Sequence, residues 1–141
     1  MAASEFLDWL GESQNFGCYP IWVCPFKNSP GVMESGHAAG GDGYLMNFGL
    51  WAPSTHNRRD FIAQNRRLEQ KVHSLNGKKW LYAHAYYTED EFWSIYDKKR
   101  YDKLRSQYNA NYLPDLYQKV RVDLDVPDEQ PGIVARVKNF L

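Results

Sequence analysis

The residues best suited to chemistry in this sequence stand together in the run 79–87, which reads Lys-Trp-Leu-Tyr-Ala-His-Ala-Tyr-Tyr. Its aromatic and small apolar residues predict a β-strand, in which side chains alternate between two faces. One face is then small and apolar, suited to packing against a helix. The other is aromatic and hydrogen-bonding, and it carries Trp80, Tyr82, His84 and Tyr86. Such a face suits a binding cleft, although a half-buried sheet with its tyrosine hydroxyls in water has the same pattern.

His84 is the candidate general acid or base of this face. Histidine as a residue type can donate and accept protons under physiological conditions, and the hydroxyls of Tyr82 and Tyr86 flank His84 in the predicted strand. A structural hydrogen bond within the sheet accounts for His84 equally well. The other histidines have no metal-ligand spacing with one another or with the two cysteines, so no metal site is expected.

Hydrophobic periodicity and turn residues predict the helices and strands that would position this run. Apolar residues at helical spacing predict a helix over 57–76, with Gly77 placed to end it. The glycine-rich connection 27–42 is expected to be a hairpin or lid, because it leads into a strand and not into a helix N-terminus. The other predicted elements are a helix over 3–10 with Phe6, Leu7 and Leu10 inward, strands over 19–26 and 44–51, one or two helices within 89–108, and a short helix beyond Pro114.

The opposite face of the predicted helix 57–76 is basic. It carries Arg58, Arg59, Arg66, Arg67 and Lys71, with Asp60 and Glu69 interleaved. Because acids interrupt the basic residues, a solvated face is favoured over an anion-binding site.

Length and composition limit the classes of protein to which this chain can belong. A chain of 141 residues with 43% hydrophobic content is expected to form one domain, 1–141, with a core over 3–108 and a helical and extended tail over 109–141. Its 17 basic and 17 acidic residues balance, which argues against a nucleic-acid binder with a basic surface. No apolar run is long enough for a membrane span, and the first residues are acidic where a signal peptide is basic. A cytoplasmic protein with reduced cysteines is therefore expected.

Several short motifs occur in an order that resembles a known family. They are Tyr19-Pro20-Ile21-Trp22-Val23-Cys24-Pro25-Phe26, Asn47-Phe48-Gly49-Leu50-Trp51, Leu68-Glu69, Leu81-Tyr82-Ala83, Glu91-Phe92-Trp93, Tyr101-Asp102-Lys103-Leu104-Arg105 and Leu113-Pro114-Asp115-Leu116-Tyr117. Together they resemble the C-terminal end of the Δ24-sterol reductase family, FAD-dependent flavoproteins related to vanillyl-alcohol oxidase. The resemblance implies an α+β fold: an antiparallel sheet with helices on one face, as in a truncated ferredoxin-like cap domain of the vanillyl-alcohol-oxidase type.

The resemblance also implies reduction of a sterol side-chain double bond with FAD and a nicotinamide reductant, provided that the rest of the enzyme is present. The family's N-terminal FAD-binding domain has no counterpart in this sequence, nor has a dinucleotide-binding glycine fingerprint. No cofactor is therefore expected in the isolated chain, and FAD only if a separate flavin domain completes it. An incomplete cap sheet exposes backbone edges, so a homodimer or a flavin-domain partner is expected. Where the family commonly has acids, this chain has Asn47 and His84.

Three functions are open on this basis. The favoured one is a small cofactor-free isomerase or cyclase, whose aromatic cleft holds a bulky polycyclic or polyene substrate in a reactive conformation. The alternatives are the substrate-binding part of an FAD-dependent Δ24-sterol-reductase-like oxidoreductase, and a non-catalytic sterol- or lipid-binding module. The candidate catalytic residues are His84, Tyr82, Tyr86 and Asn47, and the candidate substrate-binding residues are Trp22, Trp51, Trp80, Phe48 and Tyr101.

Overall fold

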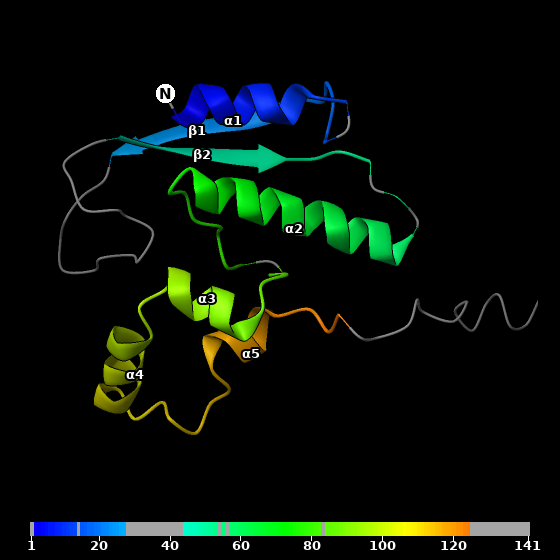
Figure 1. The fold of residues 1–141 in the computed structure, drawn as a ribbon. Coiled ribbons are helices and arrows are strands. Elements are labelled where there is room, and N and C mark those ends of the chain that lie inside the picture. The colour runs from blue at the N-terminus through cyan, green and yellow to red at the C-terminus, as the bar shows by residue number, and fades with distance from the viewer. Residues whose placement is uncertain are drawn as a thin grey trace, which may run out of the picture.

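The structure is a computed structural model that describes residues 2–13, 15–27, 44–53, 55, 57–82 and 84–124. Nearly all of the predicted connection 27–42, and the tail after residue 124, lie outside the described residues. The strands are β1 (Ile21–Lys27) and β2 (Tyr44–Leu50), and the helices are α1 (Ala2–Gly11), α2 (Arg58–Ser74), α3 (Glu89–Ile95), α4 (Lys98–Gln107) and α5 (Leu116–Val120). Figure 1 shows α1 and the hairpin on one side of α2, and α3, α4 and α5 on the other. Within the described ranges, no helix has the length and apolar character needed to cross a membrane.

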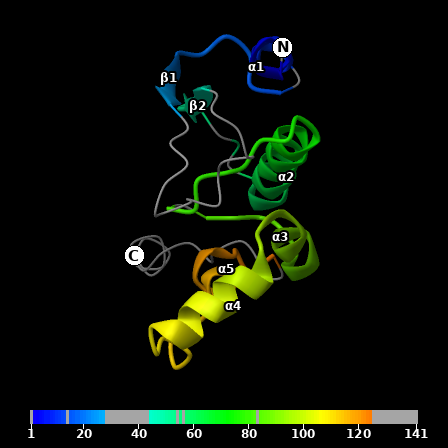
Figure 2. The ribbon, with the colours of Figure 1, turned by 90° about the vertical axis from the view of Figure 1, so that its left-hand side faces the viewer.

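β1 and β2 form a two-stranded antiparallel sheet, in which Ile21 pairs with Leu50 and Lys27 with Tyr44. This confirms the predicted α+β class at the level of a mixed fold with an antiparallel sheet. Figure 2 shows α1 and α2 on the same side of the hairpin. A two-stranded hairpin is marginally stable alone, and α1 supports it: the rings of Phe6 and Phe48 meet edge to face, 5.1 Å apart between centroids.

Helix α1 confirms most of its prediction. Phe6 and Leu10 are four residues apart, so they share one stripe of the helix, and both are buried. Leu7 was expected inward but is 37% exposed, because it lies about 100° around the helix from Phe6.

Helix α2 also confirms its prediction and has defined ends. Asn57 is the N-cap, and its Oδ1 accepts a hydrogen bond from the backbone N–H of Asp60 at 3.1 Å. At the other end Asn76 takes the left-handed conformation, with φ 56°, and the N–H of Gly77 donates to the carbonyl of Val72 at 2.8 Å. These bonds close a Schellman motif in which Asn76, and not Gly77, has the left-handed backbone.

The predicted strand over 79–87 is wrong. Among the described residues of this run, the chain turns at 81–82 and Ala85 makes an isolated parallel bridge with Arg121. On either side of Ala85 the backbone bonds to side chains: Lys79 Nζ donates to the carbonyl of His84 at 2.6 Å, and the N–H of Tyr86 donates to the carboxylate of Glu69 on α2. The alternation of faces that a strand would impose is therefore lost.

A second core lies on the far side of α2, around Phe92 of α3. It contains the buried residues Ala85, Tyr87, Phe92, Tyr96 and Val120. The core thus extends beyond residue 108 into α5, which the sequence placed in the tail. Helix α3 begins at a capping box, in which Thr88 and Glu91 bond each other's backbone N–H groups.

Candidate functional site

One face of the hairpin gathers exposed indole rings. Trp22 stands opposite Gly49, so the two residues lie on the same face of the sheet. The Trp51 ring lies over Gly49, where an added Cβ would come within 2.8 Å of it. The centroids of Trp22 and Trp51 are 6.1 Å apart, and the two side chains are 64% and 65% exposed.

A third indole lies at the other end of this face. Phe26 is on the same face as Trp22, and its ring centroid is 6.3 Å from that of Trp80. Trp80 Nε1 donates to Asn47 Oδ1 at 3.0 Å, and Asn47 pairs with Cys24 at the centre of the hairpin. None of these residues carries a formal charge. The surface is called here the aromatic face, and it comprises Trp22, Cys24, Phe26, Leu45, Asn47, Gly49, Trp51 and Trp80.

Gly49 offers a direct test of the indole pair. In Gly49→Ala the new methyl group would occupy the place of the outer ring atoms of Trp51, which is an exposed side chain and can swing away. We expect the free energy of unfolding to change by no more than about 1 kcal/mol. The exciton couplet of Trp22 and Trp51 in the far-ultraviolet circular dichroism spectrum should disappear. A retained couplet would show that the pair does not depend on the glycine.

Three of the candidate catalytic residues do not share one face. Tyr82 is 87% exposed and His84 is exposed, whereas Tyr86 is 6% exposed. The Tyr86 ring packs edge to face against Phe61 of α2, with 6.1 Å between centroids. The predicted row of imidazole and phenols is therefore absent from these residues, because the strand that would align them does not form.

The candidate substrate-binding residues divide into three places. Phe48 points to the opposite face of the hairpin, where it packs against Phe6. Tyr101 lies on α4, and its hydroxyl accepts a hydrogen bond from the N–H of Leu116 at 2.8 Å. The aromatic face unites Trp22, Trp51 and Trp80 with Asn47.

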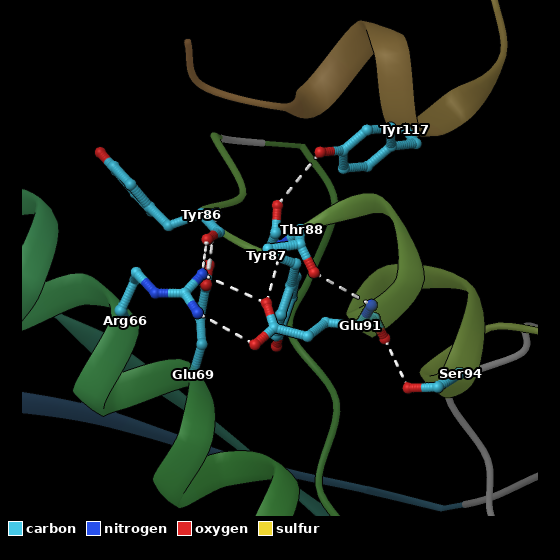
Figure 3. A network of polar contacts seen from close by, with 8 residues as sticks. All are labelled: Arg66, Glu69, Tyr86, Tyr87, Thr88, Glu91, Ser94 and Tyr117. Atoms are coloured by element: carbon cyan, nitrogen blue, oxygen red, sulfur yellow. Dashed lines mark hydrogen bonds and ion pairs between the residues drawn. The ribbon is translucent and has the colours of Figure 1, made fainter. Parts of the chain in front are cut away.

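A buried polar network, which the sequence patterns did not predict, joins α2 to the chain before α3 (Figure 3). Its centre is Glu69, which is 2% exposed. Glu69 Oε1 accepts from Lys79 Nζ at 2.7 Å and from the N–H of Tyr86 at 2.9 Å. Burial raises the pKa of the Glu69 carboxyl, while the hydrogen bond and charge of Lys79 act against that rise.

Arg66, one turn before Glu69, forms the second part of the network. Its guanidinium donates to both carboxylate oxygens of Glu91, at 2.9 and 3.2 Å, and also to the carbonyl of Tyr86. The hydrogen bond from Arg66 is the main reason why the pKa of Glu91 is lowered. Burial raises the pKa of the nearby Tyr87 hydroxyl. Figure 3 shows Arg66 directed at Glu91 across the gap between α2 and α3.

The spacing on α2 contains a signal for this network. Glu69 lies eight residues after Phe61, at the edge of the apolar stripe of the helix, where a carboxylate that is buried needs a partner. The basic face is also only partly solvated. Arg58 donates to the carbonyl of Asp123, Arg66 binds Glu91, and Lys71 pairs with Glu5, whereas Arg59 and Arg67 are exposed.

Two cavities that the described residues form are small. One, of about 10 Å³, lies between α1 and the end of the hairpin. The other, of about 80 Å³, is lined by Arg66, Glu69, Gln70, His73, Tyr87, Glu91, Ser94 and Ile95. Small-molecule and cofactor sites usually hold roughly 300–1,000 Å³. Neither of these two cavities therefore has the volume of a FAD or sterol site.

Comparisons with known proteins find similarity to Delta(24)-sterol reductases. The chain is 33% identical over 106 residues to the Delta(24)-sterol reductase of Rattus norvegicus and 32% identical over 106 residues to that of Homo sapiens. It is 31% identical over 105 residues to the Delta(24)-sterol reductase homolog dhcr-24 of Caenorhabditis elegans. Each alignment covers 72% of this chain and 20% of the relative, so the chain spans about a fifth of the length of the curated relatives it matches.

No family model and no solved structure matches the chain. The expected vanillyl-alcohol-oxidase type of cap thus stays a prediction, and the family assignment depends on the sequence relatives. By sequence, this chain is similar to Delta(24)-sterol reductases over a segment that equals about a fifth of those proteins.

Proposed function

We propose that the aromatic face binds a sterol-like molecule and forms one wall of a binding site in a Δ24-sterol-reductase-like protein. The observation that carries this proposal is the placement of exposed indoles at both ends of a face without formal charge. Exposed apolar patches on soluble domains commonly mark ligand or partner sites. The relatives are named for a sterol, which is a bulky and mostly apolar molecule.

The size of the aromatic face is consistent with such a ligand. Trp22 and Phe26 are four residues apart on β1, which at about 3.3 Å per residue is about 13 Å. A rigid fused-ring molecule lying along the strand would therefore contact the Trp22 and Trp51 rings at one end and the Trp80 ring at the other. The absence of formal charge on the face avoids desolvating an ion under the apolar ligand.

An open face can supply only part of a complete site. Small-molecule sites commonly bury about 70–90% of the ligand surface, and one sheet face covers a single side. In this proposal the second wall, together with FAD and redox chemistry, belongs to a separate flavin-binding part, which the family resemblance implies. A role of this segment as a substrate-covering cap, and the expected homodimer, stay predictions.

A cofactor-free isomerase or cyclase is the second candidate and also stays a prediction. In its favour, Asn47 and the indoles of Trp22, Trp51 and Trp80 do lie on one surface. Its proposed acid or base, His84, lies four residues after Trp80 and has an exposed side chain. Among the described residues, no hydrogen bond joins the His84 imidazole to Tyr82 or Tyr86 as a proton relay would require.

The proposal is tested by sterol binding to the purified chain. Energy transfer from tryptophan to the fluorescent sterol dehydroergosterol should saturate in the wild type. Trp22→Ala combined with Trp51→Ala should raise the Kd by about tenfold or more, because large aromatic side chains dominate such contacts. The energy-transfer signal loses donors in this variant, so the Kd is confirmed by displacement of a radiolabelled sterol.

Tyr112→Ala is the matched control, since Tyr112 is 83% exposed and lies between α4 and α5. It should leave the Kd unchanged. A long-chain alcohol is the control ligand and should compete weakly, because a flexible chain loses more conformational entropy than a rigid ring system on binding. No saturable sterol binding, or equal Kd values for the wild type and the tryptophan variant, would contradict the proposal.

A further inference from the structure

The residue that precedes Trp80 is held by contacts to three parts of the chain. Lys79 Nζ donates to Glu69 on α2 at 2.7 Å and to the carbonyl of His84 at 2.6 Å. The same ammonium lies 5.2 Å from the centroid of the Tyr86 ring. Lys79 is thus fixed through its side chain to a helix and to the far end of its own loop.

The backbone of Lys79 is fixed as well. Its carbonyl accepts a hydrogen bond from the Tyr96 hydroxyl at 2.9 Å, and Tyr96 is 9% exposed at the end of α3. Burial raises the pKa of Tyr96 to about 12, so its hydroxyl remains a donor at neutral pH. The carbonyl of Lys79 belongs to the peptide bond that leads into Trp80, so its orientation bears directly on where Trp80 points.

Glu69 also closes the other end of this loop. Its carboxylate accepts from Lys79 Nζ and from the N–H of Tyr86, so a single side chain of α2 holds both ends of the segment 79–86. Between these two points the chain turns at 81–82. Trp80 projects from the first part of the loop to the hairpin, where its indole N–H reaches Asn47.

We propose that Glu69 and Lys79 are a positioning pair that places Trp80 on the aromatic face. The inference depends on the proposed function for its ligand, since it assigns to two residues outside the face the control of one end of the sterol-like site. Glu69 and Lys79 need not touch the ligand. Their effect on binding passes through the hydrogen bond between Trp80 and Asn47.

The test uses the double variant Glu69→Gln with Lys79→Met. The glutamine oxygen can still accept from the N–H of Tyr86, and methionine keeps an apolar stem, so no buried charge is left without a partner. The readout is the Trp80 indole N–H cross-peak in the ¹H–¹⁵N spectrum, assigned by its absence from Trp80→Phe. The matched control is Glu5→Gln with Lys71→Met, which neutralises another ion pair of α2, of length 2.6 Å.

In the double variant we expect the Trp80 cross-peak to move toward the position of a free indole and its exchange with water to become faster. The cross-peaks of Trp22 and Trp51 should stay in place. The Kd for dehydroergosterol should increase by about tenfold. The control double variant should change neither quantity.

An unmoved Trp80 cross-peak in a folded double variant would overturn the positioning role, and a moved cross-peak with an unchanged sterol Kd would overturn its inferred effect on binding. If the wild type binds no sterol, the proposed function fails, whereas the cross-peak still decides whether Glu69 and Lys79 orient Trp80. A general loss of structure would move all five tryptophan cross-peaks together. That result would assign the pair to overall stability and would also contradict the inference.

Discussion

Replacement of Phe92 by alanine is expected to lower the free energy of unfolding by about 3–5 kcal/mol, the usual loss for a buried aromatic side chain. The Phe92 side chain is completely buried, and its ring centroid lies 4.7 Å from that of Tyr96 and 5.4 Å from that of Tyr117. These contacts join α3 to α5, two helices that have few other buried side chains. Removing the ring leaves a cavity that neighbouring aromatic rings are too rigid to fill.

Urea unfolding, followed by circular dichroism, measures this loss. Tyr112→Ala is the exposed aromatic control and should shift the free energy of unfolding by no more than about 0.5 kcal/mol. Equal effects of the two substitutions would mean that the α3 and α5 cluster is not a packed core.

The second large effect is expected from Lys79→Met as a single change. It removes the ammonium from Glu69 and leaves a carboxylate that is 2% exposed and, among the described residues, accepts a hydrogen bond only from the N–H of Tyr86. Breaking one side of a buried ion pair typically lowers stability by about 3–5 kcal/mol. Adding Glu69→Gln should restore most of this loss, because the uncompensated charge is then gone.

The loss of stability caused by Lys79→Met should depend on pH, and the pKa of Glu69 sets the direction of that dependence. Burial raises the pKa of Glu69 above its ordinary value of 4.5, so the folded protein binds that proton more tightly than the unfolded chain. The contribution of such a group to stability is complete below the unfolded pKa and is lost as pH rises through the folded pKa. Without Lys79 the folded pKa rises further, since the hydrogen bond and charge that oppose the rise are removed.

The stability difference between Lys79→Met and the wild type should therefore be largest near neutral pH and should shrink as the pH falls toward 4.5. Urea unfolding at several pH values measures this difference. In the background of Glu69→Gln the pH dependence should disappear. A difference that stays constant with pH would show that Glu69 is not the group left unpaired.

The elements whose signals are local could be predicted from the sequence. Helix α2 has a capping asparagine, an apolar stripe and a Schellman end within its own residues, and its position was predicted correctly. The run 79–87 has equally strong local strand propensity, yet its described residues form a turn and an isolated bridge, and the side chains of Lys79 and Glu69 bond the backbone on either side of that bridge. Tertiary contacts override propensity here.

Some members of the aromatic face could be selected from the sequence, but their arrangement could not, and other candidate residues such as Phe48 and Tyr101 lie elsewhere. Trp22, Trp51, Trp80 and Asn47 were selected as aromatic or hydrogen-bonding residues, and they do share a surface. Sequence spacing could not show that Trp80 reaches the hairpin from a loop. The sequence contains only a weak signal for the burial of Glu69, because the residue lies at the edge of the apolar stripe of α2 and a charge there is typical of a solvated face.

The end of helix α2 has a further consequence for the chemical durability of the chain. Asn76 is followed by Gly77, a pair prone to deamidation because the unhindered glycine nitrogen can attack the asparagine side chain and form a succinimide. In the folded chain that nitrogen is engaged with the carbonyl of Val72 at 2.8 Å, and the left-handed backbone of Asn76 is fixed by the same motif. The intact helix end thus protects the pair from cyclisation. The amount of isoaspartate formed at position 76 should therefore increase with the time that this helix end spends open.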